Sequence, residues 1–116
     1  MDKRLADDAR QTIEDGRNIV FVSAATIWEI EIKRALRKLE TYEGAVDTIQ
    51  LVDGSGFERL AISYEHAREA GQLPLLHGDP FDRMLIAQAR LEGLTLATTD
   101  ERIKRYDVSV LDVKPM

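Results

Sequence analysis

Short apolar runs alternate with helix-like segments along this chain, and this alternation limits the fold more than any other feature. Three runs, at 18–23 ("NIVFVS"), 94–98 ("LTLAT") and 108–111 ("VSVL"), are continuous and rich in β-branched residues, which is typical of buried strands. A fourth, "FERLAIS" (57–63), alternates loosely between apolar and polar residues. Strands separated by helices predict an α/β fold in which helices cover a parallel sheet.

The segments between these runs have helical spacing and recognisable helix boundaries. The first carries Leu5, Ala6, Ala9 and Ile13 and ends at Asp15-Gly16. The others are expected after Ser23, around 45–52, after Ser63, over 81–91 with a stop at Gly93, and after Asp100.

The predicted helix after Ser23 has two different faces. Its apolar stripe comprises Trp28, Ile32, Ala35 and Leu39, and we expect Trp28 in the core. The opposite side is basic, with Lys33, Arg34, Arg37 and Lys38, and is either a solvated face or a surface for RNA.

The composition bounds the class of protein. With 116 residues, 44% of them hydrophobic, the chain suits a single domain over residues 1–116. It has no cysteine, no apolar leader and no apolar run long enough to span a membrane, so we expect a soluble cytoplasmic protein without a membrane partner. A net charge of -5 argues against coating nucleic acid by charge alone, but it allows a nuclease with grouped carboxylates.

Three acidic residues lie where ligands gather in a parallel sheet, beyond the carboxyl ends of the strands. Glu29 falls in the second turn of the helix after 18–23, Asp82 in the first turn of the helix over 81–91, and Asp100 just after 94–98. Clustered carboxylates bind hard cations such as Mg²⁺ or Mn²⁺. The two histidines are poorly spaced for zinc, and His77 is expected to be a loop residue rather than a base.

Each candidate also has a purely structural explanation. Glu29 can pair with Lys33 at i+4, and Asp82 and Asp100 suit a first helical turn or a cap. Asp79, an additional acidic candidate, fits best as the N-cap in front of Pro80.

The stretches "SAATIWEI", "DPFDRMLIAQA" and "TTD", in this order, resemble the PIN-domain family, and specifically its VapC-type toxins of toxin–antitoxin pairs. The resemblance implies a three-layer PIN-like fold and a Mg²⁺- or Mn²⁺-dependent endoribonuclease. Carried over by position, its metal-binding and catalytic residues are Glu29, Asp82 and Asp100, with Asp79 less directly matched. Lys33, Arg34 and Arg37 are candidate RNA contacts. The implied partners are RNA, a small VapB-like antitoxin and a second copy of the chain.

The sequence also departs from this family. The family's first buried strand, which ends in an aspartate, has no counterpart near Met1, where Asp2, Lys3 and Arg4 are charged. We therefore expect an N-terminally truncated domain that lacks one strand and one carboxylate, through a misplaced start, a true truncation or a gap filled by segment exchange between subunits. The alternative function is a weak or inactive module that only binds an antitoxin or dimerises.

Overall fold

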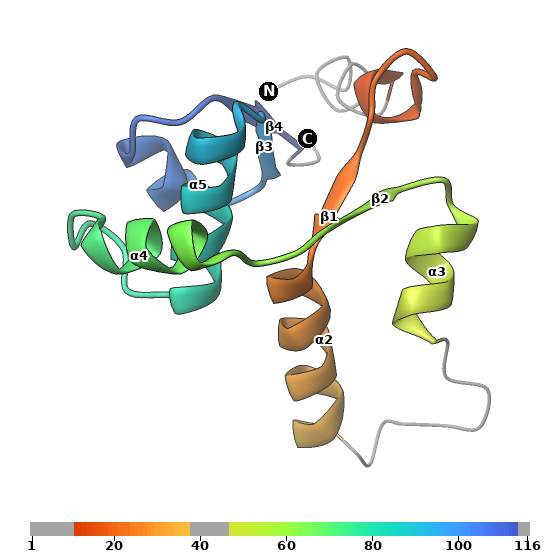
Figure 1. Cartoon of the computed structure of the whole chain (residues 1–116), viewed down its shortest axis with the longest axis horizontal. Helices are drawn as coiled ribbons and strands as arrows, with labels where there is room; N and C mark the ends of the chain where they lie inside the picture. The colour runs from red at the N-terminus through yellow and green to blue at the C-terminus, as the bar shows by residue number, and fades with distance from the viewer. Residues whose placement is uncertain (1–10, 38–46, 114–116) are drawn as a thin grey trace. The chain divides into compact units, whose positions relative to one another are not determined.

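The structure, a computed structural model, describes residues 11–37 and 47–113 (Figure 1). Contacts group the described residues into two compact units, one within residues 19–62 and the other formed by residues 11–18 and 63–113. Each unit contains one pair of short parallel strands together with helices, which confirms the α/β class and a PIN-like arrangement. The single domain and the absence of a first strand stay predictions.

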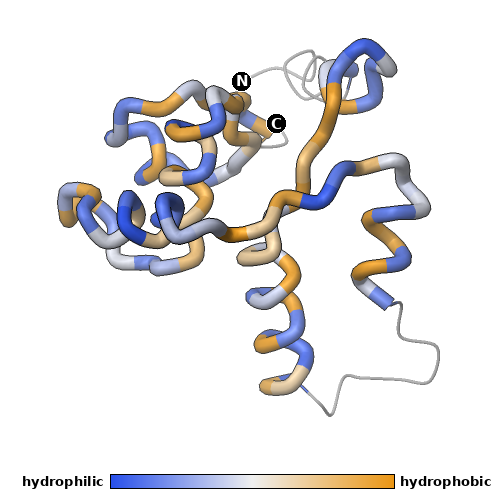
Figure 2. Tube along the Cα trace, viewed as in Figure 1, coloured by the Kyte–Doolittle hydropathy of each residue, from blue (hydrophilic) through white to orange (hydrophobic). Residues whose placement is uncertain are grey.

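The unit of residues 19–62 is built on the strand β1 (Phe21–Ser23), which runs parallel to β2 (Glu58–Leu60). The helix α2 (Ala24–Leu36) follows β1 directly because Ser23 caps it, its Oγ accepting from Ala25 N at 3.0 Å. The helix α3 (Thr48–Gly54) is capped by Asp47. In Figure 2 β1 starts with apolar residues, whereas β2 starts with hydrophilic residues.

Burial corrects one expectation for α2. Trp28 is 62% exposed, so its assignment to the core is wrong. Its helix buries only Ala25, and the described part of this unit has just two three-residue strands and one further helix with which to enclose an indole ring. Leu39 and Lys38, predicted on the two faces of this helix, lie outside the described residues.

In the other unit, α4 (Tyr64–Gln72) packs against α5 (Pro80–Glu92), and β3 (Leu96–Thr98) runs parallel to β4 (Val110–Asp112). The short 3₁₀ helix η2 (Glu101–Arg105) links the two strands. Ser63, Asp79 and Asp100 cap α4, α5 and η2, as predicted.

The core of this unit joins the loop after α4, α5 and the segment from η2 to β4. Its buried members are Leu73, Ile86, Ile103 and Tyr106. Gly93 ends α5 in the left-handed conformation, with φ at 67°, which is the stop signal that the sequence indicates. The core therefore holds α5 and the segment after β3 together. Asp82 lies in the first turn of α5, and Asp100 lies just after β3.

Candidate metal centre

Asp79 and Asp82 have different roles at the start of α5. Asp79 Oδ1 accepts from the backbone N–H groups of Phe81 at 2.9 Å and Asp82 at 3.3 Å, so Asp79 is the N-cap, and Pro80 occupies the first turn. Asp82 has no capping bond, and its side chain contacts His77 instead. The sequence prediction of a cap followed by a projecting carboxylate is confirmed for this turn.

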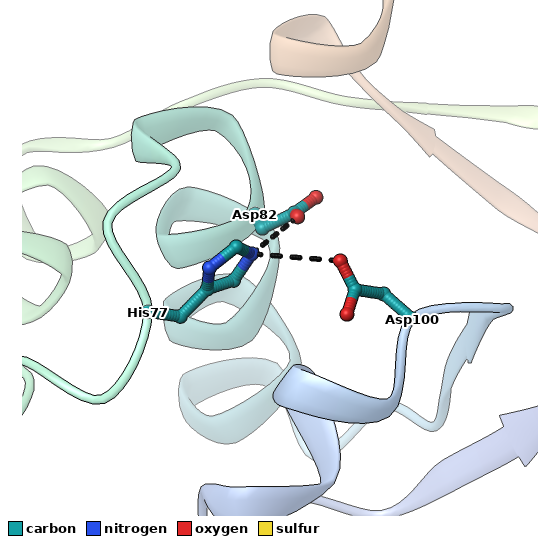
Figure 3. A group of neighbouring side chains, drawn as sticks. All are labelled: His77, Asp82 and Asp100. Carbon is teal, nitrogen blue, oxygen red and sulfur yellow. Dashed lines mark hydrogen bonds and ion pairs between the residues drawn. The ribbon is translucent and has the colours of Figure 1, made fainter.

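His77 is the residue whose role the sequence did not reveal. It lies in the loop between α4 and α5, and its side chain is only 2% exposed. Its Nε2 lies 2.7 Å from Asp82 Oδ2 and 3.7 Å from Asp100 Oδ2, so the imidazole points between the two carboxylates (Figure 3). The loop position of His77 agrees with the prediction, and its place five residues before Asp82, across the helix start, is the sequence signal for this contact.

Asp100 follows β3 and caps η2. Its Oδ1 accepts from the Arg102 backbone N–H at 2.8 Å, and the Arg102 guanidinium binds both carboxylate oxygens, with Nε at 3.1 Å and Nη2 at 2.9 Å. These hydrogen bonds, the side-chain pair above all, lower the pKa of Asp100 to about 2. Asp100 is therefore an anion at any pH near neutrality.

Glu29 belongs to α2 in the other unit, so its distance to Asp82 and Asp100 stays a prediction. Within its own unit, Glu29 Oε2 lies 3.6 Å from Lys33 Nζ, which is the i,i+4 pair that the spacing allows. The side chain is half-buried, while its lysine partner is exposed. The ion pair predicted from the spacing is therefore present. Such pairs contribute little free energy, so Glu29 can exchange Lys33 for another cation at small cost.

The predicted RNA contacts lie on the same helix. Lys33 pairs with Glu29, and Arg34 Nη1 lies 3.6 Å from Glu31 Oε2. Arg37 is the C-cap residue of α2. Their contact with RNA stays a prediction.

The groups in the unit of Asp82 fit a divalent cation. His77, Asp82 and Asp100 each offer one ligand atom, and these atoms lie within 4.8 Å of one another. Two carboxylates supply the hard oxygen donors that Mg²⁺ and Mn²⁺ prefer, and a neighbouring imidazole is more compatible with Mn²⁺ than with Mg²⁺. Two of the three predicted ligands, Asp82 and Asp100, therefore lie close together and offer the oxygen donors that the predicted ions prefer.

Comparison with known proteins decides the family. The family model described as PIN domain matches residues 2–109, which is most of the chain. The chain belongs to the PIN-domain family. No curated protein matches the sequence significantly.

Membership gives the coarse function. PIN domains are generally nucleases that use divalent metal ions, which indicates a nuclease-type function for this chain at the level of its family. The two carboxylates that the structure brings together are in keeping with that chemistry. Among the described helices, none has the length and apolar character needed to cross a membrane.

Proposed function

We propose that this PIN domain is a Mg²⁺- or Mn²⁺-dependent endoribonuclease that uses Glu29, Asp82 and Asp100. The observation that carries the proposal is the convergence of Asp82 and Asp100, 18 positions apart in the sequence, on the same imidazole nitrogen. The start of α5, which Asp79 caps, and the start of η2, which Asp100 itself caps, hold the two carboxylates there.

The reaction is hydrolysis of an RNA phosphodiester, in which a water oxygen bonds to phosphorus and one phosphorus–oxygen ester bond breaks. A bound divalent cation supplies charge neutralisation at the phosphate and a lower pKa for water. Asp82 and Asp100 hold the cation with Glu29, and both carboxylates lie partly exposed, where a phosphate can approach. Arg102, whose side chain is exposed beside Asp100, balances part of the negative charge before a cation binds.

A pair of matched substitutions tests this function. The purified chain is incubated with labelled single-stranded and hairpin RNA oligonucleotides, with Mg²⁺ or Mn²⁺ or with excess EDTA. Cleavage is expected with either ion, and it should fall at least about 100-fold in Asp82→Asn, because charge stabilisation by the metal is worth several kcal/mol. Asp79→Asn keeps a good cap and should retain cleavage.

The outcomes separate the alternatives. Cleavage that persists in EDTA or in Asp82→Asn would contradict the metal-site assignment. An equal loss in Asp79→Asn would make Asp79 a ligand as well as a cap. A wild-type chain that cleaves no RNA with either ion would contradict the nuclease and favour the non-cleaving partner-binding module.

We further propose the toxin role, with a small antitoxin and a homodimer as partners, on the resemblance of "SAATIWEI", "DPFDRMLIAQA" and "TTD" to VapC-type toxins. Induced expression of the wild-type chain in bacteria should then stop growth, and Asp82→Asn should not. Toxicity of equal strength in the variant would contradict a toxin that acts by RNA cleavage. Light scattering of the purified chain measures the dimer directly.

A further inference from the structure

The charged side chain of Arg83 is buried, although it follows Asp82 directly in the sequence. It points to the backbone at the end of α4 and in the loop that follows: its Nη2 donates to Ala70 O and Leu73 O, both at 2.9 Å. Its Nη1 donates to Pro74 O at 3.0 Å and reaches His77 O at 3.4 Å. One side chain of α5 thus holds the loop that carries the imidazole.

Tyr106 also holds this loop. Its hydroxyl accepts from the backbone N–H groups of Leu76 at 3.1 Å and His77 at 2.9 Å and donates to Pro74 O at 2.7 Å. These two acceptances and one donation engage both lone pairs and the proton of the phenol, and Arg83 Nη1 approaches the same oxygen at 3.4 Å. The ring itself is buried in the core, so the hydroxyl is a fixed anchor.

The backbone of His77 is therefore held at both of its polar groups, the N–H by Tyr106 and the carbonyl by Arg83. Loops are usually mobile because their polar groups face water. Here the polar groups are bonded to buried side chains, and the imidazole is almost fully enclosed. The direction in which Nε2 points is set before any ligand arrives.

We infer that His77 is a positioning residue that orients the Asp82 carboxylate for the cation. This inference rests on the proposed function. An ionised carboxylate can only accept, so the 2.7 Å contact places a proton on Nε2 that is donated to Asp82 Oδ2. Asp82 Oδ1 makes no hydrogen bond within the described part of the chain, and it is the oxygen presented to the cation. Hydrogen bonds of this kind orient the carboxylates that bind metals.

Replacement by glutamine separates positioning from direct ligation. The amide nitrogen of a glutamine reaches the place of Nε2 and donates a similar hydrogen bond, but it does not ligate a metal. His77→Gln should therefore keep Mn²⁺ affinity if His77 positions Asp82, and lose it as fully as His77→Ala if His77 is a ligand.

The measurement is a Mn²⁺ titration of the full chain, with free ion followed by electron paramagnetic resonance, together with RNA cleavage at each Mn²⁺ concentration. His77→Ala should raise the Mn²⁺ dissociation constant about 10- to 100-fold. Cleavage should recover in this variant as Mn²⁺ approaches saturation, whereas Asp82→Asn stays inactive. His77→Gln should stay within about threefold of wild type.

His66→Gln is the matched control. This histidine is also buried and in the same unit, but its Nδ1 accepts from Ser63 N at 3.0 Å in the cap of α4, and its Nε2 lies 3.6 Å from Glu92. Its loss should lower thermal stability without changing the Mn²⁺ dissociation constant. Tyr106→Phe keeps the ring and removes the anchor, and it should weaken Mn²⁺ binding less than His77→Ala does.

The possible results point to different failures. A wild-type chain that binds no Mn²⁺ and cleaves no RNA overturns the proposed function and this inference together. A wild type that binds and cleaves, with His77→Ala unchanged, overturns the positioning role alone. The positioning role is also overturned if His77→Gln is as impaired as His77→Ala, and the Tyr106 anchor is overturned if Tyr106→Phe equals wild type.

Discussion

The helices α2 and α5 are alike in sequence pattern and different in what they bury. Both have 13 residues, both begin at a side-chain cap, and both carry a predicted metal-binding carboxylate in the first two turns. Five residues of α5 are buried, including Arg83 and Gln88, whereas α2 buries only Ala25. Asp82 is held by an enclosed imidazole, and Glu29 is paired with an exposed lysine.

The difference shows that a carboxylate is only as well oriented as the groups around it. Asp82 has its direction set by a buried network that continues through His77 to Arg83 and Tyr106. Glu29 has a surface partner, and such pairs contribute at most about 1 kcal/mol. Disturbing the surroundings of α5 should therefore cost far more than disturbing those of α2.

The largest contrast is expected from truncating an apolar side chain on each helix. Ile86 of α5 is 0% exposed and lies in the core cluster, so Ile86→Ala should lower the free energy of unfolding by about 4 kcal/mol. Leu36 of α2 is 79% exposed, and Leu36→Ala should change it by less than about 0.5 kcal/mol. Urea denaturation measures both free energies, and equal losses would contradict the difference in burial between the two helices.

Arg83 and Arg34 offer the same contrast for a charged residue. Arg83→Met leaves carbonyl groups at the end of α4 without their donors, and it should cost about 3 kcal/mol of unfolding free energy. Arg34 pairs with Glu31 at the surface of α2, so Arg34→Met should stay within about 0.5 kcal/mol. If Arg83→Met leaves the unfolding free energy unchanged in the same urea titration, the network does not stabilise the loop.

The cap of α5 should have an intermediate effect. Asp79→Ala removes the acceptor of two backbone N–H groups and should cost about 1 kcal/mol, while Asp79→Asn keeps an acceptor and should cost little. Thermal unfolding of the metal-free chain measures the difference. Equal destabilisation by both changes would mean that the charge of Asp79, rather than its capping bond, stabilises the helix.

The surface pair of α2 should matter least at neutral pH. Lys33→Gln removes the cation 3.6 Å from Glu29 and should lower the unfolding free energy by about 0.3–0.5 kcal/mol. The loss should shrink further in high salt, which screens exposed pairs. A cost of several kcal/mol would show that Glu29 depends on Lys33 as strongly as Asp82 depends on its surroundings.

The pair of Asp100 and Arg102 gives a pH-dependent test. The pKa of Asp100 is about 2 in the folded chain, below its ordinary value of 3.8. Its contribution to stability is therefore complete above pH 3.8 and is lost as the pH falls through about 2. Arg102→Gln should move the Asp100 pKa back toward 3.8, as followed by carbon NMR of the carboxyl group, and an unmoved pKa would contradict the assigned cause.

The sequence predicted the local parts of this structure well. The caps at Ser23, Ser63, Asp79 and Asp100 and the stop at Gly93 depend on neighbouring residues, which a sequence displays directly. The projection of Asp82 beyond its cap follows from the same local geometry.

The parts that were missed depend on residues far apart in the chain. Arg83 can be buried only because the folded end of α4 supplies carbonyl groups to its guanidinium, and no local sequence pattern displays this contact. His77 reaches Asp82 because Tyr106, 29 positions later, holds its backbone. For Trp28 the prediction of burial was wrong, because an apolar stripe indicates a buried face but does not show whether other elements cover it.

We propose that carboxylates from both helices bind one metal ion, and paramagnetic Mn²⁺ tests this proposal directly. In a two-dimensional NMR spectrum of the labelled chain, substoichiometric Mn²⁺ should broaden the amide signals around Asp82, Asp100 and Glu29 together. Asp82→Asn should weaken the broadening at all three places. Broadening around Asp82 and Asp100 with none in α2 would contradict the claim and remove Glu29 from the site.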